Sequence, residues 1–261
     1  MMATAFPVGF FAGLFGIGGG LITVPFLFFI FEALGVDKSY LMHLAVGTSF
    51  AIIIPTSIVS VYTHYKHKSV DLNIVKTYGL FVVVGVILGT TFAALMKTKS
   101  LIVFFTIVVF CLGTYLLVNS NQQKKSKNKF KIHFRIIFGL LSGFISAPMG
   151  IGGAVMNVPI LKYFGYPIKK AIGSAASIGF VIALFGAIGF LYSGSLLKVN
   201  LPLSIGFINV PAFLIFIPIT MMMARVGANS AHKIDKIKLQ VFFGIFLYVV
   251  GTIFIYRYSS L

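Results

Sequence analysis

Charged residues are scarce in this sequence, and acidic ones are nearly absent. Only 10% of the 261 residues are charged, and the four acidic ones are Glu32, Asp37, Asp71 and Asp235. Soluble globular domains carry about 25% charged residues, so this composition excludes such a domain. Hydrophobic residues make up 59% of the chain, and its mean hydropathy is +1.04. These values also exclude a disordered chain, which lacks apolar residues to bury.

Catalytic and metal-binding motifs are missing as well. The chain has no G-x-S-x-G nucleophile elbow, no H-E-x-x-H zinc motif and no Walker A loop. Its single cysteine, Cys111, excludes an intrachain disulfide framework. We therefore predict that the protein is not an enzyme, that it has no catalytic or metal-binding residues, and that it needs no cofactor.

Long uncharged stretches take up most of the chain. They cover residues 1–31, 39–65, 77–96, 100–123, 136–161, 171–197, 199–224 and 239–256. Each approaches or exceeds the ~20 residues that a helix needs to cross the hydrocarbon core of a bilayer. The pattern predicts an all-α polytopic membrane protein, with the lipid bilayer as its surroundings.

The remaining charge is strongly basic. The formal net charge is +17, from 21 Lys and Arg against four acids. In a soluble protein this balance would suggest a nucleic-acid partner. Here the basic residues lie in loops between apolar stretches, where they set the orientation of a membrane protein. We therefore predict no nucleic-acid partner.

An internal repeat divides the chain. Residues 16–27 read GIGGGLITVPFL and residues 150–161 read GIGGAVMNVPIL, so seven of twelve positions match. The segments AVGTS at 45–49 and AIGSA at 171–175 also correspond. The repeat predicts a first transmembrane half over 1–118 and a second over 135–261, joined by the basic linker 119–134.

The glycine-rich motifs are expected to break a helix in each half. Glycine disfavours a helix by ~1 kcal/mol relative to alanine, and the residue before a proline avoids the helical region. We therefore expect a new helix to begin near Pro25 and Pro159, with Thr23 and Asn157 at or next to its N-cap. Each half then contains a broken or re-entrant helical hairpin followed by three transmembrane helices.

Loop charges favour re-entrant hairpins over single crossings. If both hairpins return to the side they enter from, 16 of the 21 basic residues share one side of the membrane. The other five are Lys38, Lys97, Lys99, Lys198 and Arg257. Single crossings would instead divide the charges almost equally, against the positive-inside rule. The two halves are therefore predicted to be inverted repeats, with a cytoplasmic linker and both termini non-cytoplasmic.

The glycine turns also predict a binding site for a small anion near the membrane midplane. Helices that begin there present unpaired N–H groups and a positive dipole end. The candidate substrate-binding residues are Gly16, Gly18, Gly19, Gly20, Thr23, Thr48, Ser49, Gly150, Gly152, Gly153, Asn157 and Ser174. The alternative is that these glycines serve close helix packing, which is our interpretation of G-x-x-x-G at 9–13, 85–89 and 139–143.

The paired GIGG-x-x-x-x-VP segments, followed by AVGTS and AIGSA, resemble the TauE/SafE-type sulfite exporter family, also called the toluene-sulfonate uptake permease family. The resemblance covers both halves. It departs at Ala154 and Ala175 and at the inserted SAPM of residues 146–149. It implies a multi-pass carrier of the plasma (inner) membrane that exports or takes up sulfite, an organosulfonate or a related anion without an ATPase. An anion or small-solute channel is the alternative, and a homo-oligomer stays open.

Overall fold

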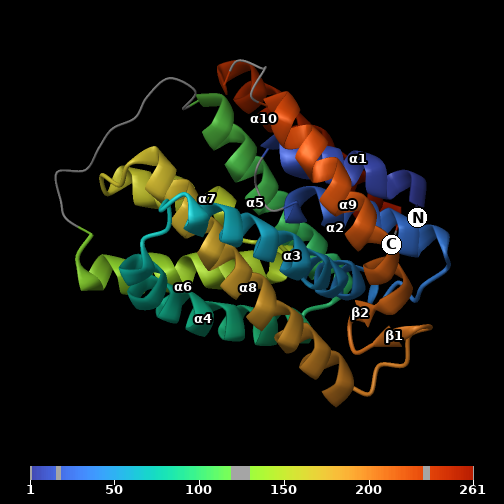
Figure 1. Ribbon diagram of the computed structural model, residues 1–261. Coiled ribbons are helices and arrows are strands. Elements are labelled where there is room, and N and C mark those ends of the chain that lie inside the picture. The colour runs from blue at the N-terminus through green and yellow to red at the C-terminus, as the bar shows by residue number, and fades with distance from the viewer. Residues whose placement is uncertain (1, 16–18, 119–129, 232–235, 261) are drawn as a thin grey trace.

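The computed structural model describes residues 2–15, 19–118, 130–231 and 236–260, which form a helical bundle with one short β-hairpin (Figure 1). The predicted Gly16 and Gly18 and most of the predicted linker lie outside these residues. The first half contributes α1 Met2–Phe15, α2 Gly20–Ala33, α3 Leu41–Lys66, α4 Leu72–Leu95 and α5 Thr98–Val118. The second contributes α6 Ile132–Met149, α7 Ala154–Tyr163, α8 Ile168–Leu196, β1 Ser204–Ile205, β2 Ile208–Asn209, α9 Val210–Ala231 and α10 Lys236–Ser260.

Seven of the described helices are long and apolar enough to cross a membrane. They are α3, α4, α5, α6 and α8, together with 210–227 of α9 and 240–259 of α10. Helices α1 and α2 are apolar but shorter. The prediction of an all-α polytopic membrane protein is confirmed.

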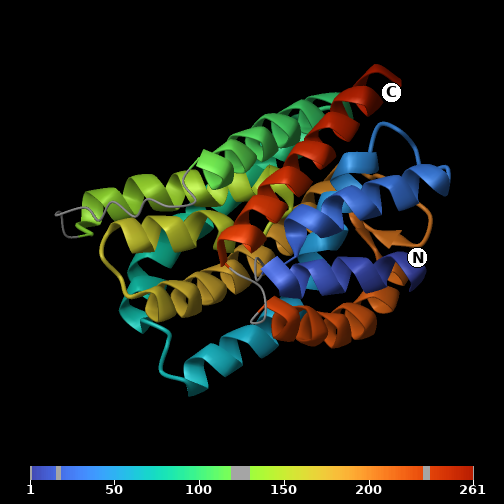
Figure 2. The same ribbon diagram turned by 90° about the horizontal axis from the view of Figure 1, so that it is seen from above.

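Each glycine-rich motif forms a helical hairpin. In the second hairpin, the ring of Phe164, just past the end of α7, lies 4.4 Å from that of Phe130, just before α6. In the first, α1 approaches the early part of α10 and α2 its late part, through Phe11 with Phe246 and Phe28 with Phe254. The two hairpins open towards opposite ends of the bundle (Figure 2). The two arms of the second hairpin differ in length, since α6 has 18 residues and α7 has 10.

The helix contacts are approximately symmetric: each major contact made by a helix of one half is repeated by the equivalent helix of the other half. Helix α4 of the first half packs against α6 of the second, and α9 of the second packs against α1 of the first. Helices α3 and α8 pack against each other at the centre, as do α5 and α10 at the side. Each hairpin also packs on its own half, α2 on α3 and α7 on α8. Every major contact therefore has a counterpart with the halves exchanged.

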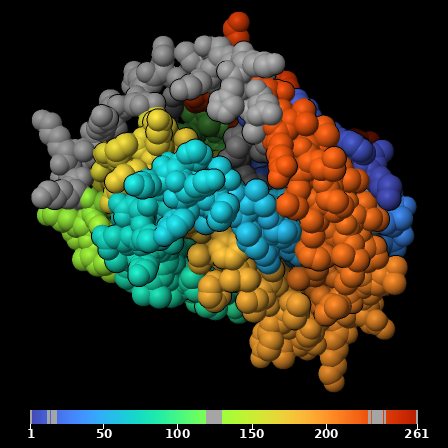
Figure 3. All heavy atoms as spheres, viewed as in Figure 1, coloured from blue at the N-terminus to red at the C-terminus, as the bar shows by residue number. Residues whose placement is uncertain are grey.

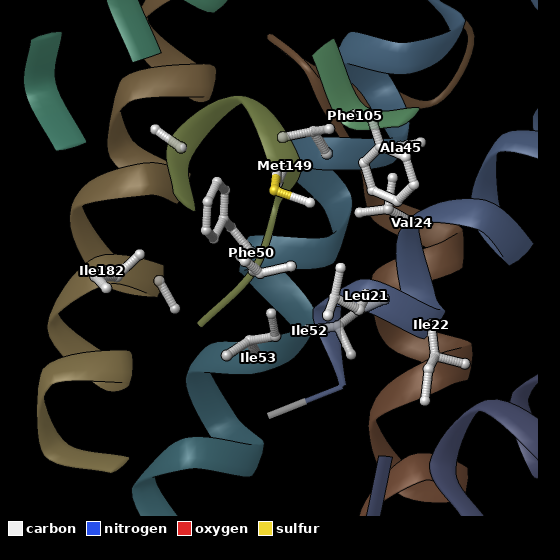
Figure 4. Close-up of a cluster of buried hydrophobic side chains, with 14 of the residues drawn as sticks. Leu21, Ile22, Val24, Ala45, Phe50, Ile52, Ile53, Phe105, Met149 and Ile182 are labelled. Carbon is white, nitrogen blue, oxygen red and sulfur yellow. The ribbon is translucent and has the colours of Figure 1, made fainter. Parts of the chain in front are cut away.

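The core lies where the hairpin ends meet α3 and α8. Figure 4 shows Leu21 and Val24 of α2, Phe50 of α3, Met149 of α6 and Ile182 of α8 gathered there. All five side chains are at most 2% exposed. On the face seen in Figure 3, side chains of α3, α8 and α9 fill the spaces between the ribbons.

The G-x-x-x-G motifs at 85–89 and 139–143 are packing elements, as predicted. A Cβ atom on Gly85 would overlap the carbonyl oxygen of Leu140, and one on Gly143 would overlap that of Val82. A Cβ on Gly89 would lie 2.7 Å from the Cβ of Ala147. The missing side chains therefore allow α4 and α6 to approach with their backbones in contact.

We expect Gly85→Ala to destabilise the protein by roughly 1–3 kcal/mol, because the added methyl group forces α4 away from α6. Gly79→Ala is the matched control on the same helix, since no atom lies within 4 Å of the position that its methyl group would take. There, better helix propensity should stabilise by up to ~1 kcal/mol. Thermal unfolding of the purified protein in detergent measures both changes. A Tm of Gly85→Ala at or above wild type would contradict the packing role.

Candidate functional site

The ends of the two hairpins touch in the core of the bundle. A Cβ on Gly20, at the start of α2, would overlap the carbonyl oxygen of Gly150 and lie 2.7 Å from the Cα of Ile151. The Ser49 hydroxyl on α3 donates a 3.0 Å hydrogen bond to the same Gly150 carbonyl. These residues bring the two glycine turns together, and we call the region formed by Gly19, Gly20 and 150–154 the hairpin tips.

Both returning helices begin at a glycine in the left-handed region. Gly19 has φ 80° and caps α2, and Gly153 has φ 67° and caps α7. The prediction that these helices begin near Pro25 and Pro159 is wrong, because each proline is the sixth residue of its helix. Each helix starts directly after its capping glycine, because the positive φ of that glycine ends the preceding turn. The proline five residues after the first helical residue does not interrupt the helix, because its fixed φ is close to the helical value.

Backbone donors collect at the start of α7. The Ile151 N–H bonds back to the Ser146 carbonyl, and the Asn157 N–H bonds to that of Gly153. Among the described residues, nothing accepts a hydrogen bond from the N–H groups of residues 152–155. The N–H groups of residues 154 and 155 belong to the first turn of α7 and carry the positive end of its dipole, and those of residues 152 and 153 lie just before it.

A buried polar cluster surrounds Asn157 on the first turn of α7. Its side-chain oxygen accepts hydrogen bonds from the hydroxyls of Tyr78 (2.6 Å) and Ser142 (2.8 Å). Its Nδ2 atom and the Oγ atom of Ser146 are buried and have no hydrogen-bond partner among the described residues. In the first hairpin, by contrast, the Thr23 hydroxyl donates to the Gly19 carbonyl of its own turn, at 2.9 Å.

Thr48 and Ser174 each hold a connecting loop through a hydrogen bond, and we call these two hydrogen bonds the braces. The Thr48 hydroxyl accepts a 2.9 Å hydrogen bond from the N–H of Asn209, whose side chain caps the start of α9. The Ser174 hydroxyl accepts a 2.9 Å bond from the N–H of Asp71, whose carboxylate caps α4. These two braces correspond under exchange of the halves.

The structure therefore divides the predicted site residues. Those at or against the hairpin tips are Gly19, Gly20, Thr23, Ser49, Gly150, Gly152, Gly153 and Asn157. Thr48 and Ser174 bond to loop backbone. The sequence analysis missed Tyr78, Ser142 and Ser146. The inserted SAPM segment, which contains Ser146, was the one signal that could have drawn attention to this region.

Removing a brace should weaken the fold. Thr48→Val and Ser174→Ala each leave a backbone N–H, of Asn209 or Asp71, without its acceptor, at a cost of about 1–3 kcal/mol. Ser177→Ala on α8 is the control, because its hydroxyl only donates to the Gly173 carbonyl one turn earlier. A Tm lowered in the first two variants and unchanged in the control would support the braces. Equal Tm values for all three would contradict them.

Comparison with known proteins places the chain in a family. The profile described as "Sulfite exporter TauE/SafE" matches residues 1–254. A "Probable membrane transporter protein" of Haemophilus influenzae is 32% identical over 93% of this chain and 92% of its own length. A similarly named protein of Methanocaldococcus jannaschii is 27% identical over 96% and 92%.

No solved structure matches the chain. Both relatives are named as probable membrane transporters, which indicates a membrane transporter of this family. The family match covers both hairpins and nearly all of the bundle. This multi-pass membrane protein belongs to the TauE/SafE sulfite exporter family.

Proposed function

We propose that the protein is a secondary transporter, exporter or permease, of a small sulfur-containing anion such as sulfite or an organosulfonate. The observation that carries this proposal is the set of unpaired donors at the hairpin tips, the N–H groups of residues 152–155 and the Asn157 amide. Such donors at a helix N-terminus suit an anion, and in a buried site they act without competition from water.

The placement of the acidic residues supports an anionic substrate. Glu32, in the last turn of α2, pairs with Arg257 at 3.6 Å, and Asp37 and Asp71 lie in loops. Asp235 lies outside the described residues. A cation carrier needs carboxylates or carbonyl oxygens in its path, and the tips offer donors instead.

The opposite directions of the two hairpins support an inverted-repeat transporter (Figure 2). The family match supports its place in the plasma membrane. In this arrangement the anion binds near the midplane, where both tips meet, and each half can open towards one side of the membrane. We propose that both termini are non-cytoplasmic and that the linker 119–134 is cytoplasmic.

Counterflow in proteoliposomes tests the function. Vesicles loaded with unlabelled sulfite should accumulate labelled sulfite against its gradient, because a carrier exchanges substrate through one binding site. The same assay should be run with an organosulfonate such as methanesulfonate. Conductive flux without saturation or counterflow would identify an anion channel. Selective movement of a cationic amine would refute an anionic substrate.

Gly152→Ala tests whether the second hairpin tip binds the anion or serves only helix packing. Its Cβ would lie 3.4 Å from the Cγ2 of Ile53, an ordinary contact, so the variant should fold. The methyl group nevertheless stands beside the donors of residues 152–155, and we expect transport to fall by tenfold or more. Uptake is normalised to monodisperse protein from size-exclusion chromatography, with Gly79→Ala as the control. Wild-type uptake by Gly152→Ala would place the anion elsewhere.

The proposed topology can be tested by labelling single cysteines in intact cells. In a Cys111→Ala background, a membrane-impermeant thiol reagent should reach Ser195→Cys, at the exposed end of α8. It should not reach Ser126→Cys in the linker until the cells are opened. Equal labelling of both positions in intact cells would exclude the inverted arrangement.

A further inference from the structure

We infer that Ser146 and the Asn157 amide form the end of the binding site that recognises the oxyanion, and that they select fully ionised sulfonates over anions that keep an O–H proton. This inference rests on the proposed transport function and adds to it the chemistry by which the substrate is chosen. It assigns the charged end of the substrate to the second hairpin.

Two unpartnered polar atoms converge on the cap of α7. A Cβ atom on Gly153 would lie 2.9 Å from Asn157 Nδ2 and 3.5 Å from Ser146 Oγ. It would also overlap Cδ1 of Ile182, so a ligand at this point has to displace the end of that side chain. Both residues are fully buried, and neither atom has a hydrogen-bond partner among the described residues. An unpaired buried polar group is costly, so two beside one turn call for a ligand that completes them.

The hydrogen bonds of Asn157 decide which atom faces this ligand. Its oxygen already accepts from the Tyr78 and Ser142 hydroxyls, which leaves the NH₂ group as the free end. Together with the N–H groups of residues 152–155, the tip therefore offers a set dominated by donors. The three oxygens of a sulfonate only accept, so they match this set. The O–H group of a protonated anion would find one side-chain acceptor there, the Ser146 hydroxyl oxygen, and would face donors at every other position.

The first hairpin lacks these features. Thr23 stands where the second half has Asn157, and its hydroxyl is already bonded to Gly19. The sequence has Ala12 where the second half has Ser142, and the SAPM insertion that supplies Ser146 has no counterpart. The unpaired side-chain donors are therefore a property of one hairpin, which suits a substrate with one charged end.

Methanesulfonate and methylphosphonate test the selectivity because they share shape and size. In mildly acidic buffer both carry a single negative charge, and only methylphosphonate keeps an O–H proton. We expect wild-type protein in detergent, measured by titration calorimetry, to bind methanesulfonate at least about tenfold more tightly. Ser146→Ala should weaken methanesulfonate binding roughly tenfold to hundredfold, the effect of losing one hydrogen bond to a charged group.

Asn157→Asp replaces the NH₂ donor by an acceptor and keeps an oxygen for Tyr78 and Ser142. It should lose methanesulfonate binding and narrow or reverse the preference over methylphosphonate. Asn157→Thr, which copies the first hairpin, serves if the aspartate variant does not fold, and should also lose affinity. Ser177→Ala, whose hydroxyl is satisfied within α8, should bind as wild type.

Wild-type affinity in both Ser146→Ala and the folded Asn157 variant would overturn the inference while counterflow by wild type still upheld the transport function. A wild-type preference for methylphosphonate would also overturn it, because the amide oxygen would then face the site. Failure of wild type to bind or exchange any sulfur oxyanion would remove the proposed function and this inference together.

Discussion

The close approach of the two hairpin tips is the contact on which the rest of the structure depends. It exists because Gly20 has no side chain where the Gly150 carbonyl lies. The positive φ angles of Gly150 and Gly153 let the backbone reverse between α6 and α7, and that of Gly19 sets the start of α2. As a result, the start of α2 lies in the core against the turn that precedes α7, where water does not weaken the dipole of α2.

The central helices connect these tips to the ends of the bundle. Ser49 and Thr48 are neighbours on α3, yet Ser49 bonds to the Gly150 carbonyl and Thr48 to the N–H of Asn209 before α9. On α8, Gly179 packs against the Gly152 carbonyl, and Ser174 holds the N–H of Asp71 before α4. If the second tip moves, it therefore displaces α3 and α8, which also hold the loops before α9 and α4. In the transporter proposed above, this linkage would couple the binding site to the connecting loops before α4 and α9.

The sequence predicted the elements whose signal is local. Glycine and proline spacing indicated both hairpins, and G-x-x-x-G indicated the α4–α6 contact, because these residues act through backbone freedom and size. The helix starts were misplaced by five residues, since proline was taken as the first-turn residue where a positive-φ glycine sets the start. Tyr78 could not be found from the sequence, because its bond joins it to Asn157, 79 residues further along the chain, and depends on the packing of α4 against α6.

The departures from exact repetition carry more information about function than the repeat does. Two identical hairpins would present the same donors from both sides, as suits a symmetric ligand. Here the first tip satisfies its side-chain hydroxyl internally, while the second leaves Asn157 Nδ2 and Ser146 Oγ unpaired. A fold selected for stability alone would be expected to pair or replace such buried groups, because each costs free energy. Elsewhere in the described residues, His43 Nδ1 and Thr106 Oγ1 of the first half are also buried and unpaired, but neither lies on a hairpin. The difference between the two tips is therefore the reason why we propose that the oxyanion of an asymmetric substrate binds at the second one.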